Sequence, residues 1–468
     1  MKIKKYINLS LFLIVNTTFI SLYGCTQTPV YVNPSKMNLN QKFFKKKSQE
    51  IENEIKKNPS ILDKDKNLKS LDWYENSASI CYFAKNYNLS YNLFDYADTK
   101  INLYEQKLLS QKLGENLASI FVNDLIKDYT PPIYERVFVN VYMSHIDLLK
   151  NNFNNFNINL NRAIERLKYA HTIFEKEISL YKEKETKKQK FKIKKESLSP
   201  IEKEYSSLDL YKPYQDFENP YVYYLKGIYY LYDGERLNSM DMFKTVYGLI
   251  KDREPATDII SKAWELAKSN EKRGYLWVIY LNGLSFKKVE KKFEIPIYTH
   301  NGVILISVAL PTLKERKKGS DTLYIVVENT TSKKVYSTKR FVNVDNLVAF
   351  EFRQRMKYIV PKEILRAAVK ALIQAESKKH FGFFGNLVST IYTKTTSKAD
   401  TRQWIWLPKE IQINIIKIPK KGKITIYVPN HRKYTLNFNE TNSDQSKIIF
   451  VRSFYPKDEV IYYEANLP

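Results

Sequence analysis

Small and aromatic residues recur at helical spacing in the first half of the chain. Two sets of four residues share the relative positions 0, 12, 16 and 19: Ala78, Ser90, Phe94 and Ala97 in one, Gly227, Ser239, Phe243 and Val246 in the other. In tetratricopeptide repeats, small residues at such spacings let two antiparallel helices approach closely within a unit of about 34 residues. The pattern predicts an α-helical, tetratricopeptide-like repeat domain over residues 61–270, although a lone helical hairpin can carry the same spacing by chance.

A third pair of helices is predicted over residues 133–180. Its charged face includes Arg162 and Arg166, which we expect to face solvent. Residues 182–204 are nearly all charged or polar, which favours a solvated insertion or a helix extension over a specific binding patch. A further amphipathic helix follows Pro255.

The periodicity changes near Tyr275, where short apolar runs replace the helical stripe. These runs predict strands over residues 275–280, 293–298, 303–309, 322–328, 333–337, 411–418 and 423–428, with others near Tyr434, Ile448 and Ile461. One helix is predicted over residues 361–379, because Pro361 suits a first helical turn and Gly382 suits a stop. The chain is therefore expected to be α+β, with a mostly antiparallel β domain over residues 271–468 that contains one long helix.

The amino terminus has the pattern of an exported lipoprotein. A basic start and an apolar run over residues 7–22 form the first two regions of a secretory signal. Gly24 and Cys25 follow at the position that lipoprotein signal peptidase cuts, so we expect residues 1–24 to be a signal peptide and Cys25 to carry acyl chains. An ordinary signal peptide or an uncleaved helix is the alternative. Residues 25–60 are polar and charged and are expected to form a flexible tether.

Composition and charge bear on the location and the partners. The 468 residues have an apolar fraction of 43%, enough to fill real cores, and a formal net charge of +26. Thr26 favours the periplasmic face of the outer membrane, since Asp after the acylated cysteine is the inner-membrane retention signal in enteric bacteria. There the charge suits anionic lipid, lipopolysaccharide or peptidoglycan and not nucleic acid, although codon bias in an AT-rich genome is the simpler explanation. Cys81 is left without a disulfide partner and is expected to be buried and inert.

No familiar catalytic or metal-binding pattern is present in the sequence. The five histidines do not pair with one another or with cysteine at a ligand spacing. No HExxH, GxSxG, P-loop or GxGxxG occurs. We therefore expect no metal, no cofactor and no enzyme activity, although a pair of glycosidase carboxylates drawn from distant residues leaves no sequence signature.

Asp400, Arg402 and Trp404 are the candidate binding residues, within the dense stretch over residues 400–408. An arginine beside two tryptophans suits a groove for a peptide or a glycan. The favoured interpretation is a structural corner that locks a loop to the sheet, in which Asp400 and Arg402 pair or cap backbone groups and Trp404 buries a large face.

Several short pieces between about residue 70 and residue 430 resemble a known family. They are Tyr134-Glu135-Arg136-Val137, Asn219-Pro220, the stretch 278–284, Ala309-Leu310-Pro311, and Asp400-Thr401-Arg402 with Trp404 and Leu407-Pro408. On these pieces the chain resembles uncharacterised Gram-negative lipoproteins with a helical, repeat-like first half and a β-rich second half. Leu281 and Ser144-His145-Ile146-Asp147 depart from that pattern. The family has no established activity or catalytic residue, and the association of its members with lipoprotein activators of penicillin-binding proteins implies a link to cell-wall synthesis.

Three hypotheses for function follow from these patterns. The leading one is a non-enzymatic, lipid-anchored scaffold of the cell envelope whose helical half binds a partner protein, within the peptidoglycan-synthesis machinery. The second is a basic module that binds anionic envelope glycan or lipopolysaccharide. The third is a cryptic peptidoglycan hydrolase.

Overall fold

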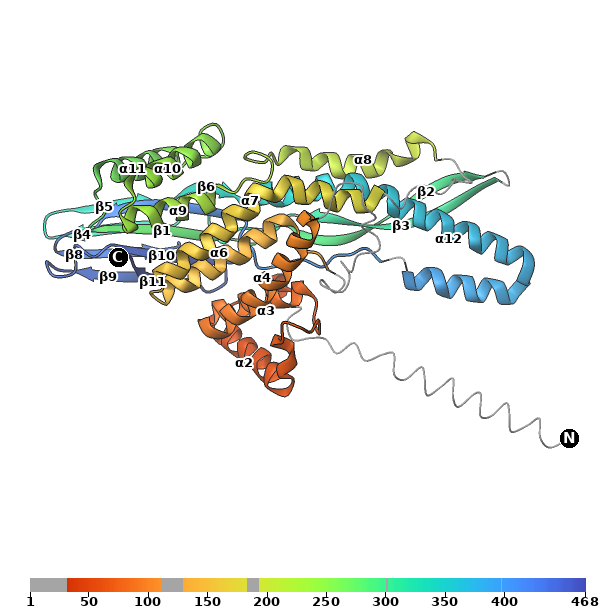
Figure 1. Cartoon of the computed structure of the whole chain (residues 1–468), viewed down its shortest axis with the longest axis horizontal. Helices are drawn as coiled ribbons and strands as arrows, with labels where there is room; N and C mark the ends of the chain where they lie inside the picture. Colours follow the sequence, from red (N-terminus) through yellow and green to blue (C-terminus); the bar gives the residue numbers. More distant parts are fainter. Residues whose placement is uncertain (1–31, 111–128, 183–192, 300–301, 397) are drawn as a thin grey trace.

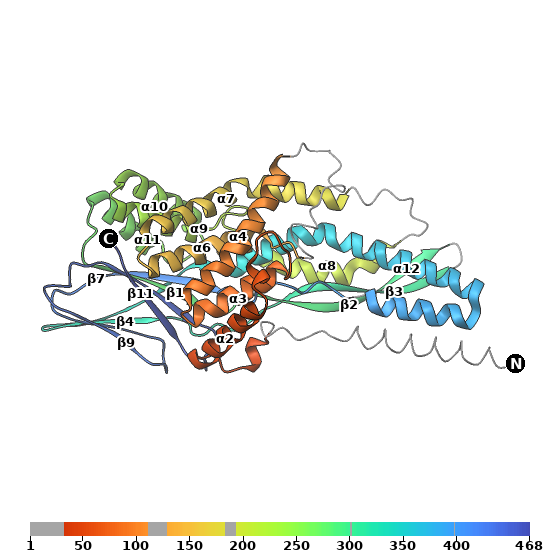
Figure 2. The same ribbon diagram turned by 60° about the horizontal axis from the view of Figure 1, so that its bottom comes forward.

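The computed structural model describes residues 32–110, 129–182, 193–299, 302–396 and 398–468. Over these residues the chain is α+β, with a helical first half followed by mostly antiparallel sheets and one long helix. Helices, a five-stranded sheet and a four-stranded sheet form three layers (Figure 1, Figure 2). Among the helices so described, none is both long enough and apolar enough to cross a membrane.

The first half of the chain is helical over the described residues. Its helices are α2 (Gln41–Lys57), α3 (Leu71–Phe83), α4 (Tyr87–Ser110), α6 (Ile133–Leu149), α7 (Phe153–Lys182), α8 (Ser199–Ser206), α9 (Pro220–Asp233), α10 (Arg236–Ile250) and α11 (Thr257–Ser269). Short 3-10 turns lie at Pro34–Lys36, Pro59–Leu62, Lys195–Leu198 and Ser207–Leu210.

Both helical hairpins that the shared register predicts are present, as α3–α4 and α9–α10. In each hairpin a serine hydroxyl of the second helix donates to a carbonyl of the first: Ser90 to Ala78, and Ser239 to Gly227, both at 2.8 Å. Gly227 is required at the closest approach, because a Cβ there would lie 2.7 Å from a ring carbon of Phe243. The pair α6–α7 packs between the two hairpins through α4 and α9.

The five-stranded sheet has the order β11-β10-β1-β7-β6, and the four-stranded sheet has the order β5-β4-β8-β9. The strands are β1 (Tyr275–Asn282), β4 (Tyr324–Asn329), β5 (Lys333–Ser337), β6 (Lys339–Asn343), β7 (Glu410–Lys417), β8 (Gly422–Tyr427), β9 (Tyr434–Phe438), β10 (Lys447–Ser453) and β11 (Ile461–Asn466). The central β1 pairs parallel with β10 and antiparallel with β7. The other pairings between described strands are antiparallel, which confirms the predicted sheet type.

The strand β1 is buried on both faces, which explains its continuous apolar run. On one face Val278 lies in the same core as Ile325, between the two sheets. On the other face Trp277 packs edge-on against Tyr224 of α9, with ring centroids 6.0 Å apart. The larger core draws residues from both halves of the chain, so the predicted boundary near residue 270 separates kinds of secondary structure and not two cores.

The flexible tether predicted for residues 25–60 is wrong for its second part, since residues 41–57 form α2. The side chain of Asn40 accepts the backbone N–H of Phe43 at 2.8 Å and begins the helix. Phe44 and Ile51 are fully buried, and the ring of Phe44 packs on that of Phe454 at 5.3 Å. Because lysine and glutamate dominate this stretch, its one narrow apolar face was not recognised in the sequence. That face packs on residues near the carboxyl terminus.

The charged insertion predicted for residues 182–204 is also only partly solvated. Residues 183–192 lie outside the described ranges. Within α8, Ile201 and Tyr205 are buried, and the hydroxyl of Tyr205 donates to the carbonyl of Pro311 at 2.8 Å. The end of this segment is therefore a helix that packs on the protein through two side chains, Ile201 and Tyr205. The many charged residues around them made this helix hard to predict from the sequence.

The long helix of the second half, predicted over residues 361–379, is instead α12 (Val344–Thr396). It begins at β6, where the side chain of Asn343 accepts the N–H of Asp345 at 3.1 Å. Pro361 lies inside the helix and not at its start. An interior proline removes one backbone hydrogen bond of the helix, and tertiary packing of the neighbouring residues must offset that loss. Ile364 and Ala368, about one and two turns beyond the proline, are buried and supply that packing.

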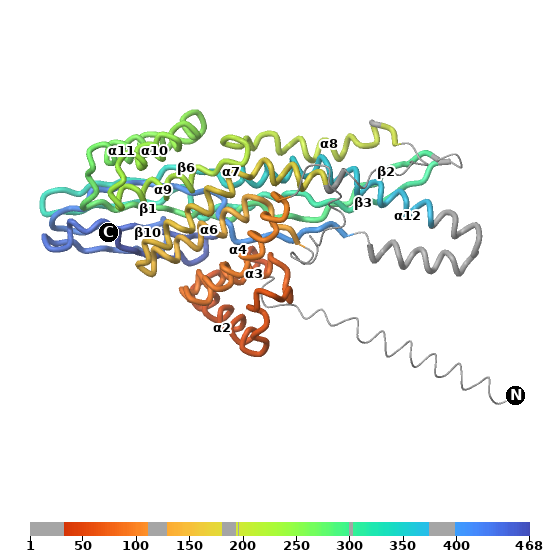
Figure 3. The backbone as a smooth tube through the Cα atoms, in the orientation of Figure 1, coloured from red at the N-terminus to blue at the C-terminus, as the bar shows by residue number. Residues whose placement is uncertain are grey.

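A two-stranded ribbon, β2 (Lys287–Thr299) and β3 (Gly302–Lys314), confirms the strands predicted over residues 293–298 and 303–309 and extends both. Asn301, in the predicted turn between them, lies outside the described residues. The ribbon pairs along its whole length, and α12 packs along β3. Together the ribbon and α12 extend away from the layered body (Figure 3). Their base, beside the start of α6, bounds the cavity described below.

We expect Gly227→Ala to destabilise the protein, because the added methyl group would overlap the ring of Phe243. Overpacking of this kind costs about 1–3 kcal/mol. The matched control is Gly248→Ala in α10, where a Cβ meets nothing within 4 Å. That change should stabilise the helix by about 1 kcal/mol. Chemical denaturation of both variants measures the difference, and equal effects of the two substitutions would contradict the packing argument.

Candidate functional site

Asp400 and Arg402 form an ion pair at the surface, as one of the two interpretations expects. The guanidinium of Arg402 donates to Asp400 through Nε at 2.9 Å and through Nη2 at 2.8 Å. Burial alone would raise the pKa of Asp400, but the hydrogen bonds and charge of Arg402 outweigh it and hold that pKa below its ordinary value. Cys25, the predicted acylation site, lies outside the described residues.

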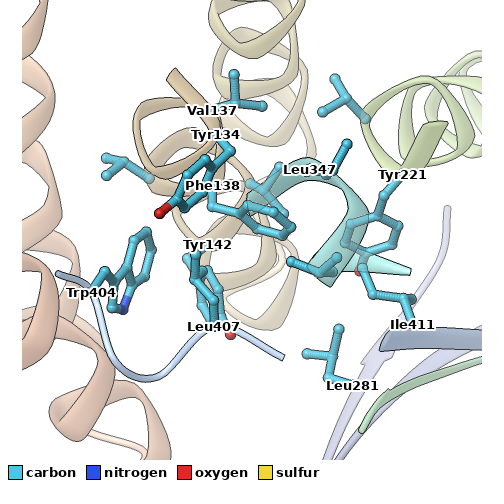
Figure 4. Close-up of a cluster of buried hydrophobic side chains, with 14 of the residues drawn as sticks. Tyr134, Val137, Phe138, Tyr142, Tyr221, Leu281, Leu347, Trp404, Leu407 and Ile411 are labelled. Atoms are coloured by element: carbon cyan, nitrogen blue, oxygen red, sulfur yellow. The ribbon is translucent and has the colours of Figure 1, made fainter. Parts of the chain in front are cut away.

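Trp404 is a core residue, so the groove interpretation is wrong for this side chain. It is 2% exposed, and its ring packs against those of Phe94 and Tyr142, each 5.4 Å away between centroids. Figure 4 shows Trp404 beside Tyr142. Its indole N–H donates to the hydroxyl of Ser79 at 2.6 Å, and its backbone N–H donates to Glu135 at 3.1 Å. Residues 400–408 are therefore a structural corner, one that locks the second half of the chain onto α3 and α6.

Asp400 also lies at the mouth of a cavity of about 430 Å³ beside this corner. Helices α6, α7 and α12 and strand β3 contribute to its walls. Tyr129, Tyr134, Phe352 and Met356 give it a largely buried apolar floor. The cavity-lining cations are Lys288, Arg355, Lys362, Arg366 and Lys398, and the cavity-lining carboxylates are Glu177, Glu363 and Asp400.

The carboxylate of Glu177 is neutralised from behind the cavity. It accepts hydrogen bonds from Arg136, from Arg355 at 2.8 Å and from the hydroxyl of Tyr104 at 3.0 Å. Burial would raise the pKa of Glu177, but the two guanidinium groups hold it below its ordinary value. Glu177 is thus an ionised structural group and is poorly suited to donate a proton.

A buried ionic network continues from Arg136 into the helical layer. Glu105 accepts from Arg136 at 3.3 Å and from Arg166 at 3.1 Å, and Arg166 donates to Asp98 at 2.7 Å. These side chains come from α4, α6 and α7 and are almost fully buried. The prediction that Arg166 faces solvent is wrong, because two carboxylates of α4 compensate its burial.

Glu351 of α12 closes the amino-terminal end of α6. Its two carboxylate oxygens accept the backbone N–H groups of Ile133 at 2.9 Å and Tyr134 at 3.2 Å. A carboxylate at this position also interacts favourably with the helix dipole. Arg355, one turn along α12, donates to Glu351 at 2.5 Å and so joins this cap to the cavity.

Glu75 and Glu135 form a second acidic centre, sealed behind the cavity floor. Glu135 accepts the hydroxyl of Tyr129 at 2.6 Å, whereas neither carboxylate oxygen of Glu75 receives a hydrogen bond from a described donor. Burial, reinforced by the charges of Glu135 and Asp72, raises the pKa of Glu75 well above its ordinary value. Burial also raises the pKa of Glu135, against the opposing charge of Lys288. Burial thus disfavours the charged form of both carboxyls, and the pair does not line the cavity.

Two further buried titratable residues, Cys81 and His145, are also poor candidates for catalysis. The Cys81 thiol is fully buried, as predicted, and burial raises its pKa to about 12. Burial lowers the pKa of His145 to about 3, and its imidazole stacks on Phe450 with centroids 4.2 Å apart. Within the described ranges, no group of three or more histidine, cysteine or acidic side chains is arranged to hold a metal.

Apart from Asp400, sequence reasoning did not single out the residues that line the cavity or hold its walls. Arg136 and Glu135 stand in a stretch that resembles the lipoprotein family, but no role was predicted for them. Arg355 and Glu351 are spaced one helical turn apart, a weak signal that resembles any exposed helical ion pair. No family model, curated protein or solved structure matches this chain, so the resemblance to a lipoprotein family stays a prediction.

We expect Glu75→Gln to reduce the loss of stability at alkaline pH. A carboxyl whose folded pKa is raised contributes stability below its unfolded pKa, near 4.5, and loses it as pH rises through the folded value. Glutamine mimics the protonated acid without a proton to lose. The variant should therefore gain stability over the wild type at about pH 8 and gain little at about pH 5.

The control is Glu177→Gln, which removes one charge from an ionised network. Breaking one partner of a buried ion pair costs about 3–5 kcal/mol, so this variant should be less stable at both pH values. Thermal unfolding at the two pH values measures both effects. A Glu75→Gln variant that loses the same stability at each pH would show that the carboxyl is ionised in the folded protein.

Proposed function

We propose that the protein is a lipid-anchored interaction protein of the bacterial cell envelope and is not an enzyme. Acyl chains on Cys25 would hold it at the periplasmic face of the outer membrane. Its helical half, a tetratricopeptide-like stack, would bind a partner protein of the peptidoglycan-synthesis machinery.

The observation that carries this proposal is the shared geometry of the helical hairpins. The hairpins α3–α4 and α9–α10 repeat the same serine-to-carbonyl hydrogen bond at the same residue spacing. The α6–α7 pair contacts α4 on one side and α9 on the other, so three hairpins stack in chain order. Stacked helical hairpins create extended surfaces that are well suited to protein partners.

A groove between α4 and α7 is the most suitable docking surface on this stack. It has a volume of about 470 Å³ and is lined by Leu103 and Tyr169 among polar residues. Leu103 is 39% exposed and Tyr169 is 36% exposed, so both offer apolar surface to a partner. Arg162 and Glu165 at its edge supply charges of both signs, which favours a protein partner over a uniformly anionic polymer.

The hydrolase alternative receives little support from the cavity. Glu177 and Asp400 are held ionised by guanidinium groups, whereas an inverting or retaining glycosidase needs one carboxyl kept protonated. Burial raises the pKa values of Glu75 and Glu135, but neither residue lines the cavity. The glycan-binding alternative rests on net charge alone, and steep weakening of binding by salt would distinguish it.

The test is site-specific photocrosslinking in intact cells. A photoreactive phenylalanine analogue at Tyr169 should form a crosslink to an envelope protein, because that ring lies in the α4–α7 groove. The matched position is Tyr336 in β5, which is 39% exposed but belongs to the four-stranded sheet. Position 336 should give no crosslink to the same protein.

Cys25→Ser serves as the control for the anchor, since serine cannot accept the thioether-linked lipid. The variant should move from the membrane fraction to the soluble fraction and lose the crosslink from position 169. Crosslinks of equal yield from positions 169 and 336 would contradict a specific docking groove. Capture of glycan without any protein would favour the basic-module alternative.

A further inference from the structure

The cavity beside the Asp400 corner combines an apolar floor with a basic rim. Tyr129 is 4% exposed, Phe352 is 5% exposed and Met356 is 4% exposed, and these side chains form the floor. Arg366 and Lys398 stand at the solvent side, where the side chain of Arg366 is 52% exposed. A volume of about 430 Å³ lies in the range of small-molecule sites, roughly 300–1,000 Å³.

The electrostatic balance of this cavity favours an anion. Five cationic side chains line it against three carboxylates. Two of these carboxylates are compensated by guanidinium groups that are not part of the lining: Glu177 by Arg136, and Asp400 by Arg402. The third carboxylate, Glu363, pairs with Arg366 of the lining at 2.9 Å. Outside the lining, Glu351 pairs with Arg355 and Glu105 pairs with Arg136, so these neighbours add as much negative as positive charge, and the lining keeps an excess of two positive charges.

We propose that this cavity binds a small organic anion, a carboxylate with an apolar body. The carboxylate pairs with the basic rim at Arg366 and Lys398. The apolar body lies on Tyr129, Phe352 and Met356, where it replaces water on a floor that has few polar atoms to hydrate. A cation of the same shape is repelled by the rim, and a neutral analogue gains only the contact with the floor.

The residues of the interior wall are fixed by hydrogen bonds before any ligand binds. Tyr134 belongs to the first turn of α6, which Glu351 caps. Arg355 is fixed by Glu351 at 2.5 Å and Glu177 at 2.8 Å. The hydroxyl of Tyr129 is held by Glu135 at 2.6 Å. A wall fixed in advance loses little conformational entropy on binding.

The test uses decanoate as the probe in isothermal titration calorimetry with the purified, non-acylated full-length mature chain. Wild-type protein should bind one decanoate per chain, and decyltrimethylammonium should not bind. The variant Arg366→Gln/Lys398→Gln should bind decanoate at least about tenfold more weakly, a loss of about 1.4 kcal/mol. Both substitutions are at exposed positions, so the fold should be retained, and circular dichroism checks this.

The matched control is Lys203→Gln/Lys212→Gln, which removes the same charge from exposed positions that do not line the cavity. Its affinity for decanoate should equal that of the wild type. The proposal is overturned if decanoate does not bind, if both double variants weaken binding equally, or if decyltrimethylammonium binds as well. These outcomes are independent of crosslinking at position 169, so failure here leaves the docking groove on α4 and α7 unaffected.

Discussion

The burial of α6 is the constraint on which the rest of the structure depends. Every residue of this helix except Leu149 is buried, including Glu135, Arg136 and Asp147. A helix enclosed on all sides must have its charges and its first N–H groups satisfied by protein, because water cannot reach them. The partners of the charged side chains and the partner of the first N–H groups come from different parts of the chain.

The partners of α6 therefore define the architecture. Arg136 draws in Glu105 of α4 and Glu177 of α7, and Glu351 of α12 caps the first turn. Glu135 holds the backbone of Trp404, and His145 stacks on Phe450 of β10. The helical layer, the long helix, the corner and the sheet thus converge on one element. The cavity lies where three of these partners meet, at the amino-terminal end of α6.

Local patterns in the sequence were sufficient for the hairpins and for most strands. Ser90 and Ser239 lie twelve residues after their carbonyl partners, so their register is readable without tertiary information. The continuous apolar run of β1 likewise reflects burial on both faces. The whole of α2 was missed, because Phe44 and Ile51 are the few apolar residues that it buries among lysines and glutamates.

Local sequence patterns could not predict the candidate site, because its contacts join residues that are far apart in the sequence. Glu351 and Ile133 are 218 residues apart, and Trp404 and Glu135 are 269 residues apart. Nothing near Arg166 indicates that its charge is compensated by Asp98, 68 residues earlier. Asp400, Arg402 and Trp404 were singled out correctly as a dense corner, yet only the fold shows that Trp404 faces inward and Asp400 faces a cavity.

The central claim is that α6 makes the helical half and the sheet one cooperative unit. Native-state hydrogen exchange on Trp404→Phe, a variant that loses the bond to Ser79 but keeps an aromatic ring, tests it most directly. Our account predicts that the opening free energy falls by the same amount for α3 amides, residues 71–83, and for β1 amides, residues 275–282. The claim would be contradicted if the α3 amides exchanged faster in the variant while the β1 amides kept their wild-type protection. That result would show two units that unfold independently.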